Sequence, residues 1–260
     1  MSDEMTESRL PTNLRLLLIL EKIGEVNAPV SPTEIAKMLN LPKQTAHRLC
    51  ATLLEEGFVV RESPGKKLRP ARRMREMATG ILDASHDHIA RHQILEAVAR
   101  SVKETVNFVM PEEKGMSYKD RVETDWAFRV QLPVGTHVPF HCTASGKCFL
   151  ASLKKSERET FIEVLPMEKL TDNTISESEA LLAELRQITK QGYAIDNEEF
   201  MDGMVAIAVP VLDYRGRFSA ALACHGPSMR LTMDNVLSKR DMLLDGADKL
   251  SKIMFNDNTN

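Results

Sequence analysis

Two short predicted helices separated by a three-residue break constrain this chain more than any other feature. The run Ser31-Pro32-Thr33-Glu34 predicts a helix start: its serine can cap the helix, its proline suits the first helical position and its glutamate stands where a capping-box carboxylate belongs. Asn40-Leu41-Pro42 ends this helix, and the next one runs over Lys43–Glu56 until Gly57 stops it. Helices joined in this way form a helix-turn-helix.

The start of the second helix carries the side chains that a DNA-reading helix needs. Leu49, Leu53 and Leu54 are expected to hold this helix to the core, which leaves its N-terminal face exposed. Side chains of these types reach base edges and phosphates when such a helix lies in the major groove. The predicted DNA contacts on the helix are Lys43, Gln44, Thr45, His47 and Arg48.

A basic hairpin is predicted directly after these helices. Phe58–Arg61 and Lys67–Arg69 read as its strands, around the turn Ser63-Pro64-Gly65. Residues 1–76 carry a net charge of +3, although the whole chain carries −3, which favours a polyanion partner at this end. The alternatives are a solvated charged face, or a three-helix packing element that does not bind DNA. The spacing of the turn, the polar face of the second helix, the basic wing and the charge together favour a winged helix-turn-helix. Its predicted wing contacts are Arg61, Lys66, Lys67 and Arg69.

The chain then divides into a linker helix and a larger unit. Ala71–Ser85 reads as a helix whose stripe of Met74, Met77, Ile81 and Leu82 is either a dimer surface or packing within the chain. We therefore expect a DNA-binding domain over 9–70, a linker helix over 71–87, and an effector-binding and oligomerisation domain over 88–256.

The larger unit alternates short apolar strands with helices, which predicts an α+β fold with an antiparallel sheet. The predicted helices are His88–Glu104, Cys142–Leu153, Lys155–Leu165, Ser176–Gln191 and Leu231–Phe255, and the predicted strands are Thr105–Met110, Tyr118–Val122, Trp126–Val130, Tyr193–Asn197, Val205–Asp213 and Phe218–His225.

Composition narrows the cellular setting. No run approaches the roughly 18 apolar residues of a membrane span, and the acidic N-terminus is not a secretory signal. The four cysteines are scattered without C-x-x-C spacing, as expected of free thiols in a reducing cytoplasm. We expect a cytoplasmic protein without a membrane partner, a cofactor or a resident metal.

One helix start in the larger unit suggests a ligand site. The helix that begins in Thr143-Ala-Ser-Gly offers free backbone N–H groups and the positive end of a dipole. Such a start suits a carboxylate or a phosphate.

Four stretches resemble the IclR-type family of bacterial transcriptional regulators, and their order and spacing span nearly the whole chain. They are LPKQTAHRLCATLLEEGFV, PVGTHVPFHCTASGKCFLASL, GYAIDNEEFMDGMVAIAVPV and ALACHGPSMRL. The resemblance implies a winged helix-turn-helix, a linker helix and a GAF-like effector domain. It also implies a dimer or dimer of dimers that represses or activates metabolic, typically catabolic, genes in response to a small organic acid.

The resemblance also implies an effector pocket, and this chain departs from the family's pattern there. Some relatives carry hydroxyl residues where this chain has Ala223 and His225, and His225 either pairs with an anionic ligand or hydrogen-bonds Asp196. The wing ends in Lys67-Leu68-Arg69-Pro70 instead of the common Tyr-x-Leu-Gly, which leaves its geometry open. The implied pocket residues are Ala127, Val130, Val138, Ala144, Ser145, Asp196, Met204, Ala206, Ala223 and His225.

Two other functions compete with this interpretation. A metal- or redox-responsive regulator could use His141, Cys142, Cys224 and His225, although neighbours on a strand point to opposite faces, so at most one of each pair can face a pocket. A hydrolase-like enzyme is disfavoured, because Ser145 lies in Thr-Ala-Ser-Gly-Lys and not in a G-x-S-x-G turn.

Overall fold

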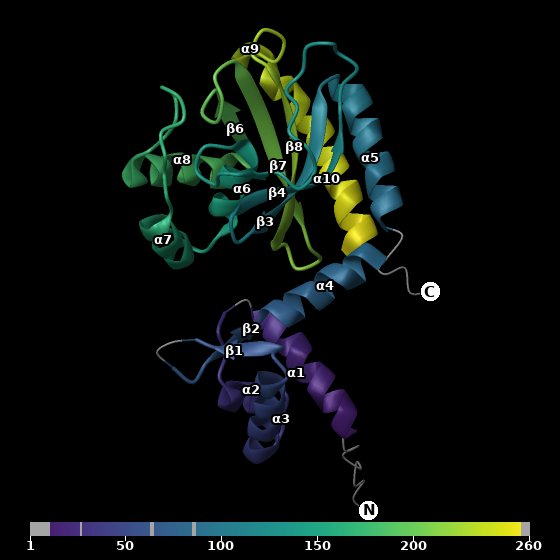
Figure 1. Cartoon of the computed structure of the whole chain (residues 1–260), viewed down its shortest axis with the longest axis vertical. Coiled ribbons are helices and arrows are strands. Elements are labelled where there is room, and N and C mark those ends of the chain that lie inside the picture. The colour runs from purple at the N-terminus through teal and green to yellow at the C-terminus, as the bar shows by residue number, and fades with distance from the viewer. Residues whose placement is uncertain (1–10, 27, 63–64, 85–86, 256–260) are drawn as a thin grey trace, which may run out of the picture. The chain divides into compact units, whose positions relative to one another are not determined.

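The computed structural model describes residues 11–26, 28–62, 65–84 and 87–255. The chain separates into two compact units, residues 1–85 and 86–260, and each is described by itself (Figure 1). No described helix is both long and apolar enough to cross a membrane.

The first unit packs the helices α1, α2 and α3 against a small hairpin, and the helix α4 follows the hairpin. Its elements are α1 (Thr12–Val26), α2 (Pro32–Met38), α3 (Lys43–Glu55), β1 (Val59–Arg61), β2 (Leu68–Pro70) and α4 (Arg72–Ala84). Leu68 also pairs with Val30, which ties the hairpin to the segment before α2. A core that includes Ile19, Ile35 and Leu53, each almost fully buried, holds the helices together.

The predicted capping box is present at the start of α2. The backbone N–H of Glu34 donates to Ser31 Oγ at 3.2 Å, and the Glu34 carboxylate accepts from the Ser31 N–H at 2.7 Å. Asn40 then adopts a left-handed φ of 50° in the turn, and Gly57 a φ of 71° after α3. The side chain of Leu41, in the turn between α2 and α3, packs against the core of this unit. Ser63, Pro64 and Ser85 lie outside the described residues.

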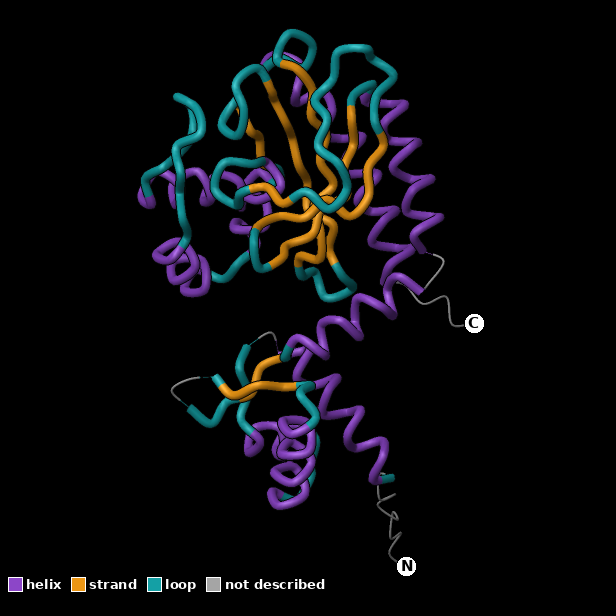
Figure 2. Tube along the Cα trace, in the orientation of Figure 1, coloured by secondary structure: helices purple, strands orange, loops and turns teal. Residues whose placement is uncertain are grey.

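The second unit is built on one six-stranded antiparallel sheet in the order β5-β4-β3-β8-β7-β6 (Figures 1 and 2). Every pairing in the sheet is antiparallel, as predicted. The strands are β3 (Thr105–Glu112), β4 (Gly115–Val122), β5 (His137–Val138), β6 (Ala194–Asn197), β7 (Met204–Leu212) and β8 (Phe218–Pro227).

Helices cover both faces of this sheet. The helices α5 (Asp87–Val102) and α10 (Arg240–Phe255) lie side by side on one face, which we call the paired-helix face (Figure 1). On the opposite face, the α6 face, α6 (Ala144–Ser152) packs on the sheet, α8 (Ser178–Gln191) packs on α6, and α7 (Lys155–Val164) contacts α8. The helices and strands of the predicted α+β fold are confirmed at most positions.

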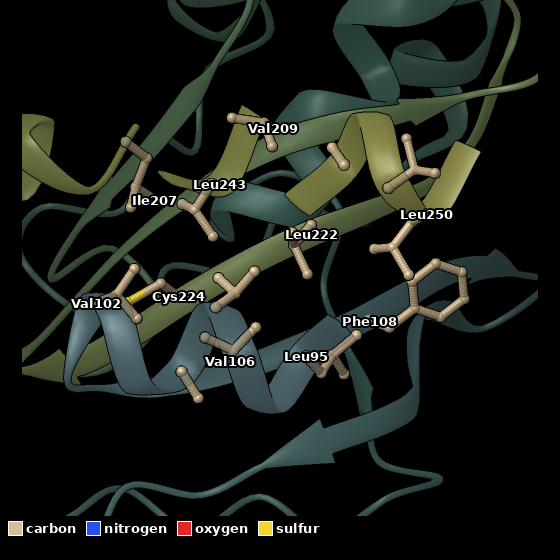
Figure 3. Packing of buried hydrophobic residues seen from close by; sticks show 14 of the residues in the cluster. Leu95, Val102, Val106, Phe108, Ile207, Val209, Leu222, Cys224, Leu243 and Leu250 are labelled. Carbon is tan, nitrogen blue, oxygen red and sulfur yellow. The ribbon is translucent and has the colours of Figure 1, made fainter. Parts of the chain in front are cut away.

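Side chains alternate between the two faces of the sheet along each strand, and this divides the core into two parts. On the paired-helix face, β7 and β8 contribute Ile207, Val209 and Leu222, which pack with Leu243 and Leu250 of α10 (Figure 3). On the α6 face, the same strands present small side chains, including Ala206, Ala208 and Ala223. The central strands β7 and β8 therefore present large side chains to one face and alanines to the other.

Two element predictions are wrong. Trp126–Val130 is not a strand but part of the long connection after β4, and the two-residue strand β5 replaces it at the sheet edge. Its carbonyls are bound by arginine side chains instead of a neighbouring strand: Arg230 donates to Phe128 O at 2.9 Å and Arg121 to Val130 O at 2.7 Å. The predicted Leu231–Phe255 helix is broken into a short helix α9 (Met233–Val236), a 3₁₀ turn (Leu237–Lys239) and α10.

Candidate DNA interface and ligand-binding face

The recognition helix α3 presents the polar surface that the sequence predicted. Lys43, Gln44 and Arg48 are exposed near its start, whereas Leu49 and Leu53 are buried on the opposite side. Thr45 is half-buried, and His47 is exposed. The imidazole of His47 lies 3.2 Å from the hydroxyl of Thr33, so α2 partly fixes this ring.

The basic stretch between residues 61 and 75 divides into two groups. Arg61, Lys66, Lys67 and Arg69 are exposed on the hairpin. Arg73 of α4 instead bonds to the first unit itself: its guanidinium donates to Glu56 O at 2.6 Å and lies 4.3 Å from the centre of the Phe58 ring. The wing group is open to a polyanion, and Arg73 joins α4 to the end of α3.

In the second unit, α6 begins in tight contact with the chain before it. Thr143 caps the helix, because its hydroxyl accepts from the Gly146 N–H at 3.1 Å. A Cβ at Gly146 would lie 2.3 Å from the Phe140 carbonyl oxygen, so only glycine fits there. The amides of Ala144 and Ser145 donate no hydrogen bond within the part of the chain that the structure describes. Unpaired amides at a helix start are groups that can bind an anion.

A row of residues crosses the sheet on the α6 face. The register pairs His225 with Ala206 and Ala206 with Asp196, and Ala223 and Met204 lie on the same face of their strands. Asp196 is fully buried; its Oδ1 accepts from the Glu199 N–H at 2.7 Å and its Oδ2 has no partner among the described residues. Burial, together with the nearby Glu199, raises the pKa of Asp196 to about 7.

A buried ion pair joins α6 to the loop after β6. Lys147 is 1% exposed, and its ammonium donates to the carboxylate of Glu199 and lies 3.5 Å from that of Glu184. Burial raises the pKa of Glu199, and the Lys147 charge opposes that rise. Because Glu199 also donates its backbone N–H to Asp196, the pair links α6 to the carboxyl group of the row.

His225 is held by groups other than Asp196. Its Nδ1 lies 3.1 Å from the Asn107 side-chain nitrogen, and its Nε2 lies 3.4 Å from the Val130 carbonyl oxygen. Burial and the charge of Arg121 lower the pKa of His225 to about 4, so the ring is neutral. Of the two roles considered for His225, the hydrogen bond to Asp196 is not formed.

The structure brings most, but not all, of the predicted pocket residues together. Asp196, Met204, Ala206, Ala223 and His225 share the α6 face, and Ala144 packs on the same core. Ala144 and Ser145 lie in the first turn of α6. Val130 contacts the row through its carbonyl oxygen, which lies 3.4 Å from His225 Nε2. Val138, in the edge strand β5, packs in the same buried cluster as Ala144, whereas Ala127 is exposed on the long connection.

Two models of known families match this chain. The IclR helix-turn-helix domain matches residues 14–63, and the domain described as "Bacterial transcriptional regulator IclR C-terminal" matches residues 82–252. The chain belongs to the IclR family of bacterial transcriptional regulators. It is a DNA-binding regulator and not an enzyme.

Individual relatives and solved structures agree with this membership. The regulator is 36% identical to the probable transcriptional regulator SauR of Cupriavidus necator, over 92% of this chain and 95% of the relative. It is 29% identical to the transcriptional regulator KdgR of Escherichia coli, over 93% and 91%. The crystal structure of the Thermotoga maritima IclR aligns with a TM-score of 0.62 at 28% identity, covering 95% of this chain and 99% of that one.

The metal-responsive alternative finds no support in the geometry of this IclR-family regulator. Cys224 points into the core of the paired-helix face, whereas His225 lies on the α6 face. His141 bonds the Glu168 carbonyl at 2.9 Å. Within the described ranges, no group of three or more His, Cys, Asp or Glu side chains is placed to hold a metal ion.

Sequence reasoning missed three polar groups of the α6 face. Asn107 and Arg121 are register partners on neighbouring strands, and Lys147 is buried in α6. Asn107 could have been noticed in the sequence, since it is a polar residue inside the apolar predicted strand Thr105–Met110. For Lys147 no local signal exists, because its partner lies in a distant loop.

Proposed function

We propose that this IclR-family regulator controls catabolic genes because its affinity for operator DNA changes when a small carboxylate binds the α6 face. One arrangement supports this proposal most strongly. The unpaired amides of Ala144 and Ser145 meet an alanine-floored face that carries Asp196, whose Oδ2 is buried and unpaired. Buried polar groups are normally satisfied, so a set left open suits a ligand.

On the DNA side, we assign the base and phosphate contacts to α3 and the wing. Lys43, Gln44, Thr45, His47 and Arg48 form the α3 surface, and the wing contributes Arg61, Lys66, Lys67 and Arg69. Side chains at the start of a recognition helix read base edges, and a basic wing contacts the backbone.

The DNA assignment is tested by fluorescence anisotropy on the upstream regions of the regulator's own and neighbouring genes. We expect Lys43→Ala and Arg48→Ala each to weaken specific binding by about tenfold. Lys155→Ala is the matched control, because it removes an exposed charge from α7. Equal losses in all three variants, or no specific binding by the wild type, would contradict the assignment.

The ligand assignment is tested by a thermal-shift screen with small carboxylates, followed by anisotropy with operator DNA. A carboxylate that binds should raise the Tm and change the DNA affinity, since coupling between two sites is reciprocal. Asp196→Ala and His225→Ala should reduce both effects, and Glu163→Ala, an exposed carboxylate on α7, should not. A ligand that stabilises all four proteins equally would place the pocket elsewhere.

We also propose that the regulator is a homodimer or a dimer of dimers, with α4 as one contact. Met77 is 42% and Ile81 64% exposed on this helix, more than an apolar stripe normally shows. Light scattering after chromatography should give a multiple of the chain mass, and Ile81→Glu should lower it. A wild-type monomer would refute the assembly.

A further inference from the structure

A cavity of about 630 Å³ lies at the edge of the sheet in the second unit. Its walls come from the turn between β3 and β4, the edge strand β5 with the residues that follow it, the end of α7, and the segment after α7. Val138 lines it, whereas the other pocket residues implied by the family resemblance, all within the described ranges, do not. The cavity is therefore separate from the row that carries Asp196.

The walls of this cavity are mainly apolar and include two aromatic rings. Phe140 and Phe161 meet edge to face, with ring centres 5.3 Å apart and ring planes at 86°. Val164 is 80% and Leu170 38% exposed where they line the cavity, so apolar surface remains for an occupant to cover. An aromatic occupant would gain both this burial and contacts with the two rings.

His141 supplies the cavity with a hydrogen-bond acceptor. This side chain lines the cavity and is 1% exposed. Its Nε2 lies 2.9 Å from the Glu168 carbonyl oxygen, which can only accept, so Nε2 carries the proton. Burial lowers the pKa of His141, so the ring is neutral at neutral pH and Nδ1 is an acceptor. Nδ1 is buried and has no hydrogen-bond partner among the described residues. A donor that reaches it, by displacing a lining side chain, would satisfy this group.

The charges around the cavity disfavour an anion. The charged side chains of Glu113, Lys114 and Glu168 line it at exposed positions, and two of these three are carboxylates. His137 is bound to Glu112, 2.6 Å away. An anion would lose its water beside the aromatic rings without a buried cation among the described lining residues to replace it, which is costly. The cavity therefore suits a neutral molecule, unlike the helix start of α6.

One wall of the cavity is joined directly to the first turn of α6. The hydroxyl of Thr143 donates to Pro139 O at 2.6 Å. Gly146 lies against Phe140 so closely that a Cβ would stand 2.3 Å from its carbonyl oxygen. A molecule that displaces the segment around Phe140 and His141 must therefore also displace the start of α6.

We propose that this cavity is a second ligand site, which binds a neutral aromatic molecule whose single hydroxyl donates to His141 Nδ1. The ring packs against Phe140 and Phe161, and the hydroxyl becomes the missing partner of the imidazole. Binding shifts the first turn of α6 through the segment 139–141. The site goes beyond the carboxylate site of the proposed function in both place and chemistry.

The experiment compares matched probes on the full-length protein by NMR titration. The probes are 4-ethylphenol, 4-ethyltoluene, in which a methyl group replaces the hydroxyl, and 4-ethylbenzoate. The phenol should bind the wild type about tenfold more tightly than the toluene, and the benzoate should not displace it. In His141→Leu, the phenol and the toluene should bind within about twofold of each other. The amide signals of Ala144 and Ser145 should shift when the phenol saturates the wild type.

A second variant keeps the inference testable if His141→Leu does not fold. Val164→Trp places a large side chain at the exposed edge of the cavity and should weaken binding of the phenol by about tenfold. Val134→Trp, at an exposed valine outside the cavity lining, is the control and should bind the phenol as the wild type does.

Three results would overturn the site: equal binding of phenol and toluene by the wild type, displacement of the phenol by the benzoate, or equal losses in the two tryptophan variants. Unshifted amide signals of Ala144 and Ser145 at saturation would overturn its connection to α6. None of these measurements requires a carboxylate at the start of α6, so their failure leaves the proposed function standing, and failure of the carboxylate screen leaves this site standing.

Discussion

The two faces of the C-terminal sheet use alternate residues of the same strands for opposite purposes. On the paired-helix face, Val205, Ile207 and Val209 alternate with Met204, Ala206 and Ala208 on the α6 face. The first face is filled by large apolar side chains. The second combines alanines with buried polar groups whose hydrogen bonds are incomplete. Burial of large apolar groups stabilises a fold, whereas unpaired buried polar groups cost stability and suit a ligand. Stability is therefore concentrated on one face and binding capacity on the other.

The largest effect is expected where a charge of the α6 face loses its counter-ion. Lys147→Met leaves Glu199 buried and uncompensated, which should lower the free energy of unfolding by about 3–5 kcal/mol. The double variant Lys147→Met, Glu199→Leu should recover much of that loss. Urea denaturation monitored by circular dichroism measures both. Additive losses in the double variant would mean that the two side chains are not energetically coupled.

A somewhat smaller loss is expected from the paired-helix face. Leu222 is fully buried between β3, β7 and the helices, so Leu222→Ala should cost about 3 kcal/mol through lost burial and the cavity left behind. Leu237→Ala, at a position 46% exposed, is the control and should cost little. Similar costs for the two variants would show that this face is not the main source of stability.

Two buried groups of the α6 face should make the stability of the fold depend on pH. Asp196, with its pKa raised to about 7, binds more protons when folded, so its contribution to stability falls as pH rises from about 4 to about 7. His225, with its pKa lowered to about 4, has the opposite effect between pH 4 and 6.5. In Asp196→Asn, stability should therefore rise relative to the wild type by at most about 1.4 kcal/mol per pH unit over this range. Denaturation at pH 5, 6 and 7 tests this, and parallel curves for the two proteins would contradict it.

The smallest expected difference concerns local opening. Cys142 on the α6 side and Cys224 on the paired-helix face are both fully buried, and burial raises the pKa of both thiols. A face with incomplete hydrogen bonds should open locally at lower free energy than a dry core. Iodoacetamide should therefore label Cys142 about tenfold faster than Cys224 in the native protein, as read by peptide mass spectrometry. Equal rates would indicate that both cysteines react only through global unfolding.

Local signals in the sequence predicted the first unit almost completely. The capping box at Ser31, the turn at Asn40 and the stop at Gly57 each depend on residues within a few positions of one another. The larger unit was predicted wherever alternation or helical periodicity was long. The prediction of a strand over Trp126–Val130 was wrong although its residue pattern resembles a strand. Its carbonyl oxygens accept hydrogen bonds from the side chains of Arg121 and Arg230, which lie elsewhere in the sequence.

The candidate site was predictable only in part for the same reason. The start of α6 and the late strands could be recognised from short motifs, which placed Ala144, Ala206 and Asp196. The orientation of Asn107 depends on His225, 118 positions away, and the pairing of Lys147 with Glu199 crosses 52 positions. Such pairings follow from sheet register and helix placement, which no local pattern in this sequence encodes.

The contact of Arg73 has a mechanical consequence for the DNA-binding unit. By bonding Glu56 just after α3 and lying over the Phe58 ring before β1, Arg73 connects α4 to the end of the recognition helix and to the base of the wing. A helix of 13 residues is about 20 Å long, so tilting it by 10° displaces its far end by about 3 Å. Because Arg73 contacts both the end of the recognition helix and the base of the wing, we expect such a tilt to move them together against the operator.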